Sequence, residues 1–149
     1  YPAHNMRPTE IGGILGLSQL KRLSKNIQKR NNNFEFFLSL LDSSKYRTDL
    51  DLRGHSNYAL IVILKKSNLE LRNKVETTLF KKGIEFRRGL SGGGNQLRQP
   101  YLQIIAKNYN LNGFPNIEHI HNYSWYIGNY PKLEKKKIMD LAAILNKIN

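Results

Sequence analysis

The longest helical pattern in the sequence begins with His4-Asn5-Met6-Arg7-Pro8-Thr9-Glu10-Ile11. The Thr9 hydroxyl is suited to cap the first turn of a helix, and Glu10 places a negative charge at the positive end of the helix dipole. Apolar residues then recur at helical spacing, at Ile11, Ile14, Leu15, Leu20, Leu23, Ile27, Phe34, Phe37, Leu38 and Leu41. We predict a long helix that starts after Thr9, with a candidate break at Asn31-Asn32-Asn33.

Three glycines, Gly12, Gly13 and Gly16, fall inside the first turns of this predicted helix. Glycine in a helix interior costs about 1 kcal/mol relative to alanine. We therefore expect a compensating feature, such as the close approach of another backbone or of a ligand.

The remaining pattern predicts a small sheet with helices around it. A polar, turn-rich passage from Asp42 to Asn57 precedes an apolar strand over Tyr58–Leu64. Ser67-Asn68-Leu69-Glu70 is typical of a capping box, and Gly83 stands where a left-handed C-cap belongs. Ile84-Glu85-Phe86-Arg87 alternates like a short strand. A last amphipathic helix is indicated by the apolar residues Ile138, Leu141, Ala142, Leu145 and Ile148.

Length and composition are those of one compact unit. The chain has 149 residues, 40% of them hydrophobic, and a formal net charge of +13, which favours phosphate-bearing partners. The longest apolar run, Ala59–Leu64, is far shorter than a membrane span, so we expect no membrane insertion. With no cysteine and no secretory signal, a cytoplasmic location is expected. Because the chain starts at Tyr1 and not at a methionine, we expect it to be a fragment of a larger protein.

A glycine loop, Ser91-Gly92-Gly93-Gly94-Asn95, is flanked by cations that suit a phosphate group. Arg87, Arg88 and Arg98 offer guanidinium donors in fork geometry, and a diphosphate is a plausible guest. The loop lacks the Gly-Lys-Ser/Thr ending of a P-loop and the spacing of a dinucleotide-binding fold. A plain surface loop is the alternative interpretation.

Two further patterns suggest other chemistry. His119-Ile120-His121 is predicted to place two imidazoles on one face of a strand, but no third ligand nearby completes a set, so no metal site is expected. Aromatic residues gather before Pro131 among basic residues, as in binders of single-stranded nucleic acid: Tyr123, Trp125, Tyr126 and Tyr130. No sequence signature of a known nucleic-acid-binding fold accompanies them, and packing in the core and at its rim is the more ordinary explanation.

Four blocks, taken in order, resemble the DegT/StrS family of sugar aminotransferases, which depend on pyridoxal phosphate. The first is His4–Ile11 followed by Gly16-Leu17-Ser18-Gln19-Leu20, and the second is Lys82-Gly83-Ile84-Glu85-Phe86-Arg87. The third is Gly94-Asn95-Gln96-Leu97-Arg98-Gln99-Pro100, and the fourth is Trp125-Tyr126-Ile127-Gly128-Asn129-Tyr130-Pro131. The last two blocks are similar to the subgroup that acts on nucleotide-linked keto-deoxysugars in the synthesis of surface polysaccharides such as lipopolysaccharide O-antigen.

The resemblance implies an α/β fold of the α+β type. Residues 1–45 would form a connecting and dimerisation helix region, and residues 46–149 the small C-terminal α/β domain of a fold-type I aminotransferase. The large domain that binds pyridoxal phosphate would be absent from this chain. None of its lysines stands in the family's Schiff-base context, so the resemblance implies no catalytic residue here and no transamination by the chain alone. The complete enzyme would be a homodimer with glutamate as amino donor.

The resemblance also implies which residues of this chain contribute to the shared site. Asn5 matches a family asparagine that reaches the cofactor phosphate of the neighbouring subunit. Arg7 matches a basic position on the substrate side. Arg87, Asn95 and Arg98 match, by motif position, residues near the nucleotide-sugar site.

Two alternatives stay open from the sequence. The family contains deoxysugar dehydratases in which histidine replaces the Schiff-base lysine, and that position lies outside this chain. The other alternative, from a different class, is a small basic module that binds RNA or DNA, which the missing motifs disfavour.

Overall fold

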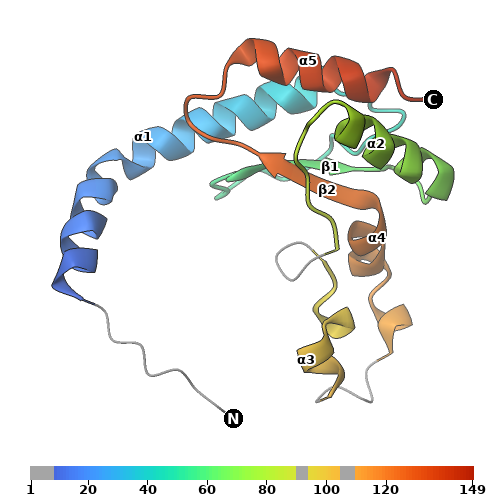
Figure 1. The fold of residues 1–149 in the computed structure, drawn as a ribbon, viewed down its shortest axis with the longest axis horizontal. Coiled ribbons are helices and arrows are strands. Elements are labelled where there is room, and N and C mark those ends of the chain that lie inside the picture. The colour runs from blue at the N-terminus through green and yellow to red at the C-terminus, as the bar shows by residue number, and fades with distance from the viewer. Residues whose placement is uncertain (1–8, 90–93, 105–109) are drawn as a thin grey trace.

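The computed structural model describes residues 9–89, 94–104 and 110–149, which form a small α+β domain with a long leading helix (Figure 1). The main elements in order are α1 (Glu10–Leu40), β1 (Ala59–Ile63), α2 (Leu69–Lys81), α3 (Pro100–Gln103), α4 (Pro115–Tyr123), β2 (Ser124–Gly128) and α5 (Lys135–Asn146). Two short 3-10 helices, η1 (Gln96–Arg98) and η2 (Leu111–Gly113), flank α3. The predicted small sheet with helices and a long leading helix is confirmed.

Helix α1 begins as predicted but continues past the expected break. The Thr9 hydroxyl accepts a hydrogen bond from the backbone N–H of Gly12 at 3.4 Å. The prediction of a break at Asn31–Asn33 is wrong, because the helix runs unbroken to Leu40. Asn31 donates its side-chain amide to the His55 carbonyl at 3.1 Å, and Asn33 donates to Asn129 Oδ1 at 3.1 Å. These tertiary hydrogen bonds outweigh the weak helix propensity of asparagine.

The two halves of α1 lie in different surroundings. Its C-terminal half packs against α5 and buries Phe34 and Phe37, whereas its N-terminal half extends away from the domain (Figure 1). Apolar side chains on that half are exposed: Ile11, Ile14, Leu15, Leu17, Leu20 and Leu23. A Cβ added at Gly13 or Gly16 would meet nothing within 4 Å, so the described residues supply no compensating close approach there. None of the described helices is both long and apolar enough to cross a membrane.

Strands β1 and β2 pair antiparallel and form a sheet with two different faces. Leu60 lies opposite Ile127 and Val62 opposite Trp125 on the face that belongs to the hydrophobic core. The other face, which we call the outer face, carries Ala59, Ile61, Tyr126 and Gly128. The alternation places the hydrophobic core on one side of the sheet. On the outer face Ala59 is buried, and Ile61 and Tyr126 are half-buried.

Helices α2 and α5 complete the core over the inner face of the sheet. Val75 and Leu79 of α2 are buried with Ile138 and Leu145 of α5. Helix α2 starts one residue later than the predicted capping box places it, because its N-cap is Asn68 and not Ser67. The Asn68 side chain accepts from the Leu71 N–H at 2.9 Å. The predicted C-cap is confirmed, since Gly83 has a φ of +67°.

The predicted strand over Ile84–Arg87 is reduced to a single bridge. The Arg87 N–H donates to the Tyr126 carbonyl at 3.1 Å, and the Tyr126 N–H donates to the Arg87 carbonyl at 3.0 Å. The bridge fixes the backbone of Arg87 beside the outer face of the sheet.

Candidate functional site

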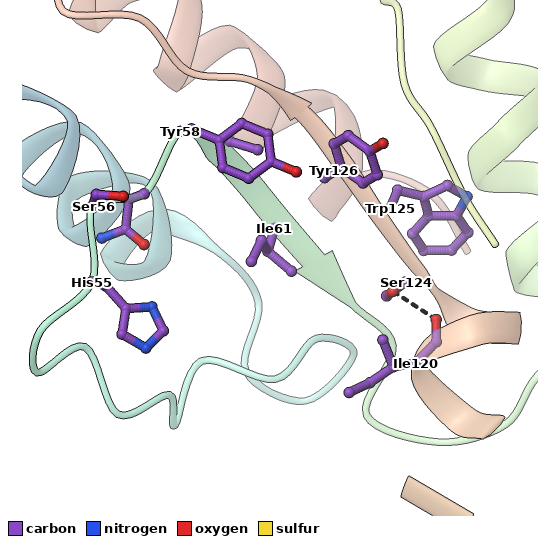
Figure 2. A pocket seen from close by; sticks show the side chains of 10 residues that line it. His55, Ser56, Tyr58, Ile61, Ile120, Ser124, Trp125 and Tyr126 are labelled. Carbon is purple, nitrogen blue, oxygen red and sulfur yellow. Dashed lines mark hydrogen bonds between the residues drawn. The ribbon is translucent and has the colours of Figure 1, made fainter. Parts of the chain in front are cut away.

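The outer face of the sheet carries two open clefts that share Tyr58, Ala59 and Tyr126. The first has a volume of about 280 Å³ and continues past Ile61 toward α4 (Figure 2). Figure 2 shows the rings of Tyr58 and Tyr126 next to each other on this face, and their centroids are 6.1 Å apart in an edge-to-face arrangement. The clefts therefore have an aromatic wall, which suits the flat faces of sugars and nucleobases.

The second cleft, of about 260 Å³, brings Arg87 to the aromatic pair. It is lined by Arg87 together with Glu85, Phe86 and Gly128. The Arg87 side chain is 59% exposed, and its guanidinium lies 3.7 Å from a Glu85 carboxylate oxygen. An ion pair this exposed is weak, so the guanidinium can turn to an anionic ligand at little cost.

Asn95 and Arg98 converge on Glu118 of α4 in a different part of the chain's surface. Asn95 donates its side-chain amide to Glu118 Oε1 at 2.6 Å. Arg98 donates to both carboxylate oxygens, from Nε at 2.9 Å and from its terminal nitrogen at 2.6 Å. These hydrogen bonds, that of Arg98 first, hold the pKa of the Glu118 carboxyl below its ordinary value of 4.5. Glu118 is therefore a charged anchor for the segment that contains both predicted residues.

Asn95 is buried, with only 3% of its surface exposed. Its side-chain oxygen accepts the Leu97 N–H at 2.9 Å and so caps η1. Its backbone N–H donates to Nδ1 of His121 at 3.0 Å. The described contacts of Asn95 thus shape the local backbone.

The prediction that His119-Ile120-His121 lies on a strand is wrong, because these residues form the last turns of α4. Pro115 occupies the first turn of that helix, where a proline is favoured, and residues two apart on a helix do not face each other. His119 Nε2 lies 2.7 Å from the Leu64 carbonyl, while His121 contacts Asn95. Among the described residues, no group of three or more histidine or acidic side chains is placed to hold a metal ion.

Glu76 of α2 is a second acidic anchor that the sequence did not single out. It accepts hydrogen bonds from Arg88 and from the indole nitrogen of Trp125, the latter at 3.0 Å. Trp125 is 1% exposed and belongs to the core, which agrees with the packing interpretation for this residue. Glu76 and Glu118 were detectable only as acidic residues in a strongly basic chain.

The predicted site residues therefore fall into three groups. Asn5 and Arg7 lie outside the described residues. Asn95 and Arg98 are brought together by Glu118. Arg87 lines the aromatic cleft instead, with its backbone bridged to Tyr126.

The fold defines a class of protein: the small C-terminal domain, with its leading helix, of enzymes that have the pyridoxal-phosphate aminotransferase fold. The chain belongs to the DegT/DnrJ/EryC1/StrS aminotransferase family, whose model matches residues 1–146. The predicted resemblance is thereby confirmed.

Individual relatives support the same assignment. The chain is 30% identical over 148 residues to GDP-4-keto-6-deoxy-D-mannose 3-dehydratase of Yersinia pseudotuberculosis, covering 98% of this chain and 37% of the relative. It is 27% identical over 135 residues to lipopolysaccharide biosynthesis protein RfbH of Salmonella typhimurium (strain LT2), covering 87% and 30% respectively.

One solved structure extends the comparison to three dimensions. It is GDP-4-keto-6-deoxymannose-3-dehydratase with a trapped PLP-glutamate geminal diamine, with a TM-score of 0.77 and 26% sequence identity. The match covers 97% of this chain and 37% of that chain. The chain thus spans about a third of the length of these relatives and corresponds to their C-terminal part.

Proposed function

We propose that this chain is the C-terminal domain of a pyridoxal-phosphate-dependent enzyme that acts on a nucleotide-linked keto-deoxysugar in surface-polysaccharide synthesis. Support comes from family membership and from relatives named as a GDP-keto-deoxymannose dehydratase and a lipopolysaccharide biosynthesis protein. Membership of this family also favours an enzyme over the nucleic-acid-binding alternative. The cytoplasm is the proposed location.

The observation that carries the proposal is the placement of Arg87 beside an aromatic pair. Its guanidinium offers two parallel N–H donors to a diphosphate, and the rings of Tyr58 and Tyr126 offer apolar surface to the sugar or base. The outer face of the sheet is the substrate side in this proposal. The adjoining cleft toward Ile61 leaves room for the remainder of the ligand.

Asn95 and Arg98 are proposed to shape the same site from the side of α4. Arg98 is paired with Glu118, and 40% of its side chain is exposed. Asn95 contributes to the site by fixing the backbone of η1, because its side chain caps η1 and donates to Glu118. That these two residues contact the substrate stays a prediction.

The upstream part of the protein is proposed to hold the cofactor. Pyridoxal phosphate supplies an electron sink for the chemistry at the sugar carbon when a protein orients it. In this proposal the Schiff-base residue lies upstream, and the chain alone is inactive. Asn5 is proposed to donate its amide to the cofactor phosphate of a second subunit, with Arg7 on the substrate side.

We propose that the exposed half of α1 connects this domain to the upstream part of the protein and takes part in the dimer. Ile14 and Leu17 are among its exposed apolar side chains, at 68% and 66% exposure. A contiguous apolar surface of this kind marks an interaction site. In this proposal, an upstream part of the protein and the second subunit of the homodimer supply the surface that it contacts.

Two activities fit the proposal, and one isotope experiment separates them. Aminotransfer is the first, and dehydration is favoured by the similarity to the Yersinia dehydratase. The complete protein would be incubated with pyridoxal phosphate, ¹⁵N-glutamate and a GDP-linked 4-keto-6-deoxysugar, and the sugar product analysed by mass spectrometry. Aminotransfer gives a product that carries ¹⁵N, whereas dehydration gives one without ¹⁵N and with one oxygen atom fewer. A sugar that is unchanged, or changed equally without pyridoxal phosphate, would contradict the proposal.

A further inference from the structure

The ring of His121 lies against Gly89 and Gly94, which are the two ends of the segment 89–94. Nδ1 accepts the backbone N–H of Asn95 at 3.0 Å. A Cβ added at Gly94 would lie 2.6 Å from Nδ1, and one added at Gly89 would lie 3.2 Å from Cε1. Gly89 also has a φ of +63°, which other residues rarely adopt. Only glycine at both positions lets the imidazole contact the backbone here.

The same histidine stands between the two groups of predicted site residues. Arg87 precedes Gly89 by two residues, and Asn95 directly follows Gly94. Helix α4 and strand β2 are consecutive, and they fix Arg87 through the Tyr126 bridge and Asn95 through His121. The α4–β2 unit therefore sets the positions of both ends of the segment.

We propose that His121 is a positioning residue of the nucleotide-sugar site, holding Asn95 and Arg98 in place relative to Arg87 through an unprotonated Nδ1. The inference rests on the proposed function for the identity of the ligand. The contact itself depends only on the geometry of His121, Gly94 and Asn95.

The contact requires the neutral imidazole, because Nδ1 accepts a hydrogen bond only without a proton. Burial, followed by the positive charge of Arg98, lowers the pKa of His121 below 6.5, with Arg88 acting in the same sense and Glu118 opposing it. Between the lowered pKa and 6.5, His121 binds more protons in the unfolded chain than in the folded chain, so the stability that this residue contributes rises with pH in that interval. The contact is present at neutral pH and is lost as the pH falls through the lowered pKa.

Two substitutions separate the hydrogen bond from the shape of the side chain. His121→Asn keeps an acceptor, since Oδ1 of asparagine is as many bonds from the backbone as Nδ1 of histidine, and it does not titrate. His121→Leu keeps an apolar bulk and removes the acceptor. His119→Asn, two residues earlier on α4, is the matched control because its imidazole contacts the Leu64 carbonyl instead.

Amide hydrogen exchange of Asn95, measured by NMR on the 149-residue chain, tests the contact. The protection factor of wild type and of His119→Asn should fall about tenfold between neutral pH and a pH below the lowered pKa of His121, the worth of one hydrogen bond. His121→Asn should keep high protection at both pH values, and His121→Leu should show low protection at both. Wild-type protection in His121→Leu, or a wild-type pH response in His121→Asn, would overturn the proposal.

The positioning role is tested in the complete protein by steady-state kinetics with a GDP-linked keto-sugar. At neutral pH, His121→Leu should raise KM about tenfold with little change in kcat, whereas His121→Asn should restore the wild-type KM. An unchanged KM in His121→Leu overturns the positioning role while the proposed function stands. A wild-type protein that does not bind the nucleotide sugar overturns the proposed function, and the inference fails with it.

Discussion

Trp125→Ala is expected to lower the free energy of unfolding by about 3–5 kcal/mol, the usual cost of removing a buried aromatic side chain. Trp125 is 1% exposed and lies opposite Val62 on the core face of the sheet. The substitution leaves a cavity between the sheet and α2, and it removes the indole donor to Glu76. Urea unfolding followed by far-UV circular dichroism measures the change.

Two further variants give this experiment its controls. Phe80→Ala removes another large aromatic side chain, but one that is 82% exposed, so it should cost within about 0.5 kcal/mol of zero. Trp125→Phe keeps a buried ring, leaves a smaller cavity than Trp125→Ala, and loses the hydrogen bond to Glu76, at a cost of about 1 kcal/mol for the bond. Equal effects of Trp125→Ala and Phe80→Ala would show that the sheet does not cover the core as described.

Arg87→Ala, introduced into the complete protein, is expected to raise KM for the nucleotide-linked sugar by about 10- to 100-fold. A hydrogen bond to a charged group contributes about 1.5–3 kcal/mol, which corresponds to this range. Because the diphosphate is remote from the reacting carbon, binding should suffer more than kcat. Steady-state kinetics with a GDP-linked keto-sugar measures both constants.

Arg47→Ala is the matched control for this substitution. Arg47 also pairs with a carboxylate two residues away, with its Nε 3.6 Å from Asp49, and its side chain is 47% exposed. It lies in the turn-rich passage before β1 and does not line either cleft on the outer face. Its loss should leave KM unchanged, and an equal effect of the two variants would mean that general positive charge, and not the Arg87 site, attracts the substrate.

The sequence predicts the elements that local rules determine. Thr9 caps α1, the apolar run over Tyr58–Leu64 contains β1, and Gly83 ends α2 in the left-handed conformation. Each follows from a residue whose preference is strong and whose partners are close in sequence. The family motifs are likewise local patterns, and they identified the fold.

Elements determined by distant contacts were predicted less well. Asparagine disfavours a helix locally, yet Asn31 and Asn33 stay in α1 because His55 and Asn129 accept their amides. The run His119-Ile120-His121 reads as a strand by alternation, but Pro115 starts a helix that includes it. A single sequence does not show whether the local or the tertiary preference prevails.

The candidate site shows the same division. Its basic residues could be listed from motif positions, but their arrangement depends on acidic partners from other elements. Glu118 reaches Asn95 from 23 residues away, and Glu76 reaches Arg88 from 12 residues away. Neither carboxylate stands in a motif. The sequence therefore contains no pattern that would place Arg87 in a different part of the site from Asn95 and Arg98.

We propose that the outer face of the sheet holds the nucleotide of the substrate. A crystal structure of the complete protein with pyridoxal phosphate and GDP tests it most directly. We predict that the diphosphate lies within hydrogen-bonding distance of the Arg87 guanidinium, with Tyr58 and Tyr126 against the ligand. A nucleotide bound elsewhere, with no contact to these three residues, would contradict the account.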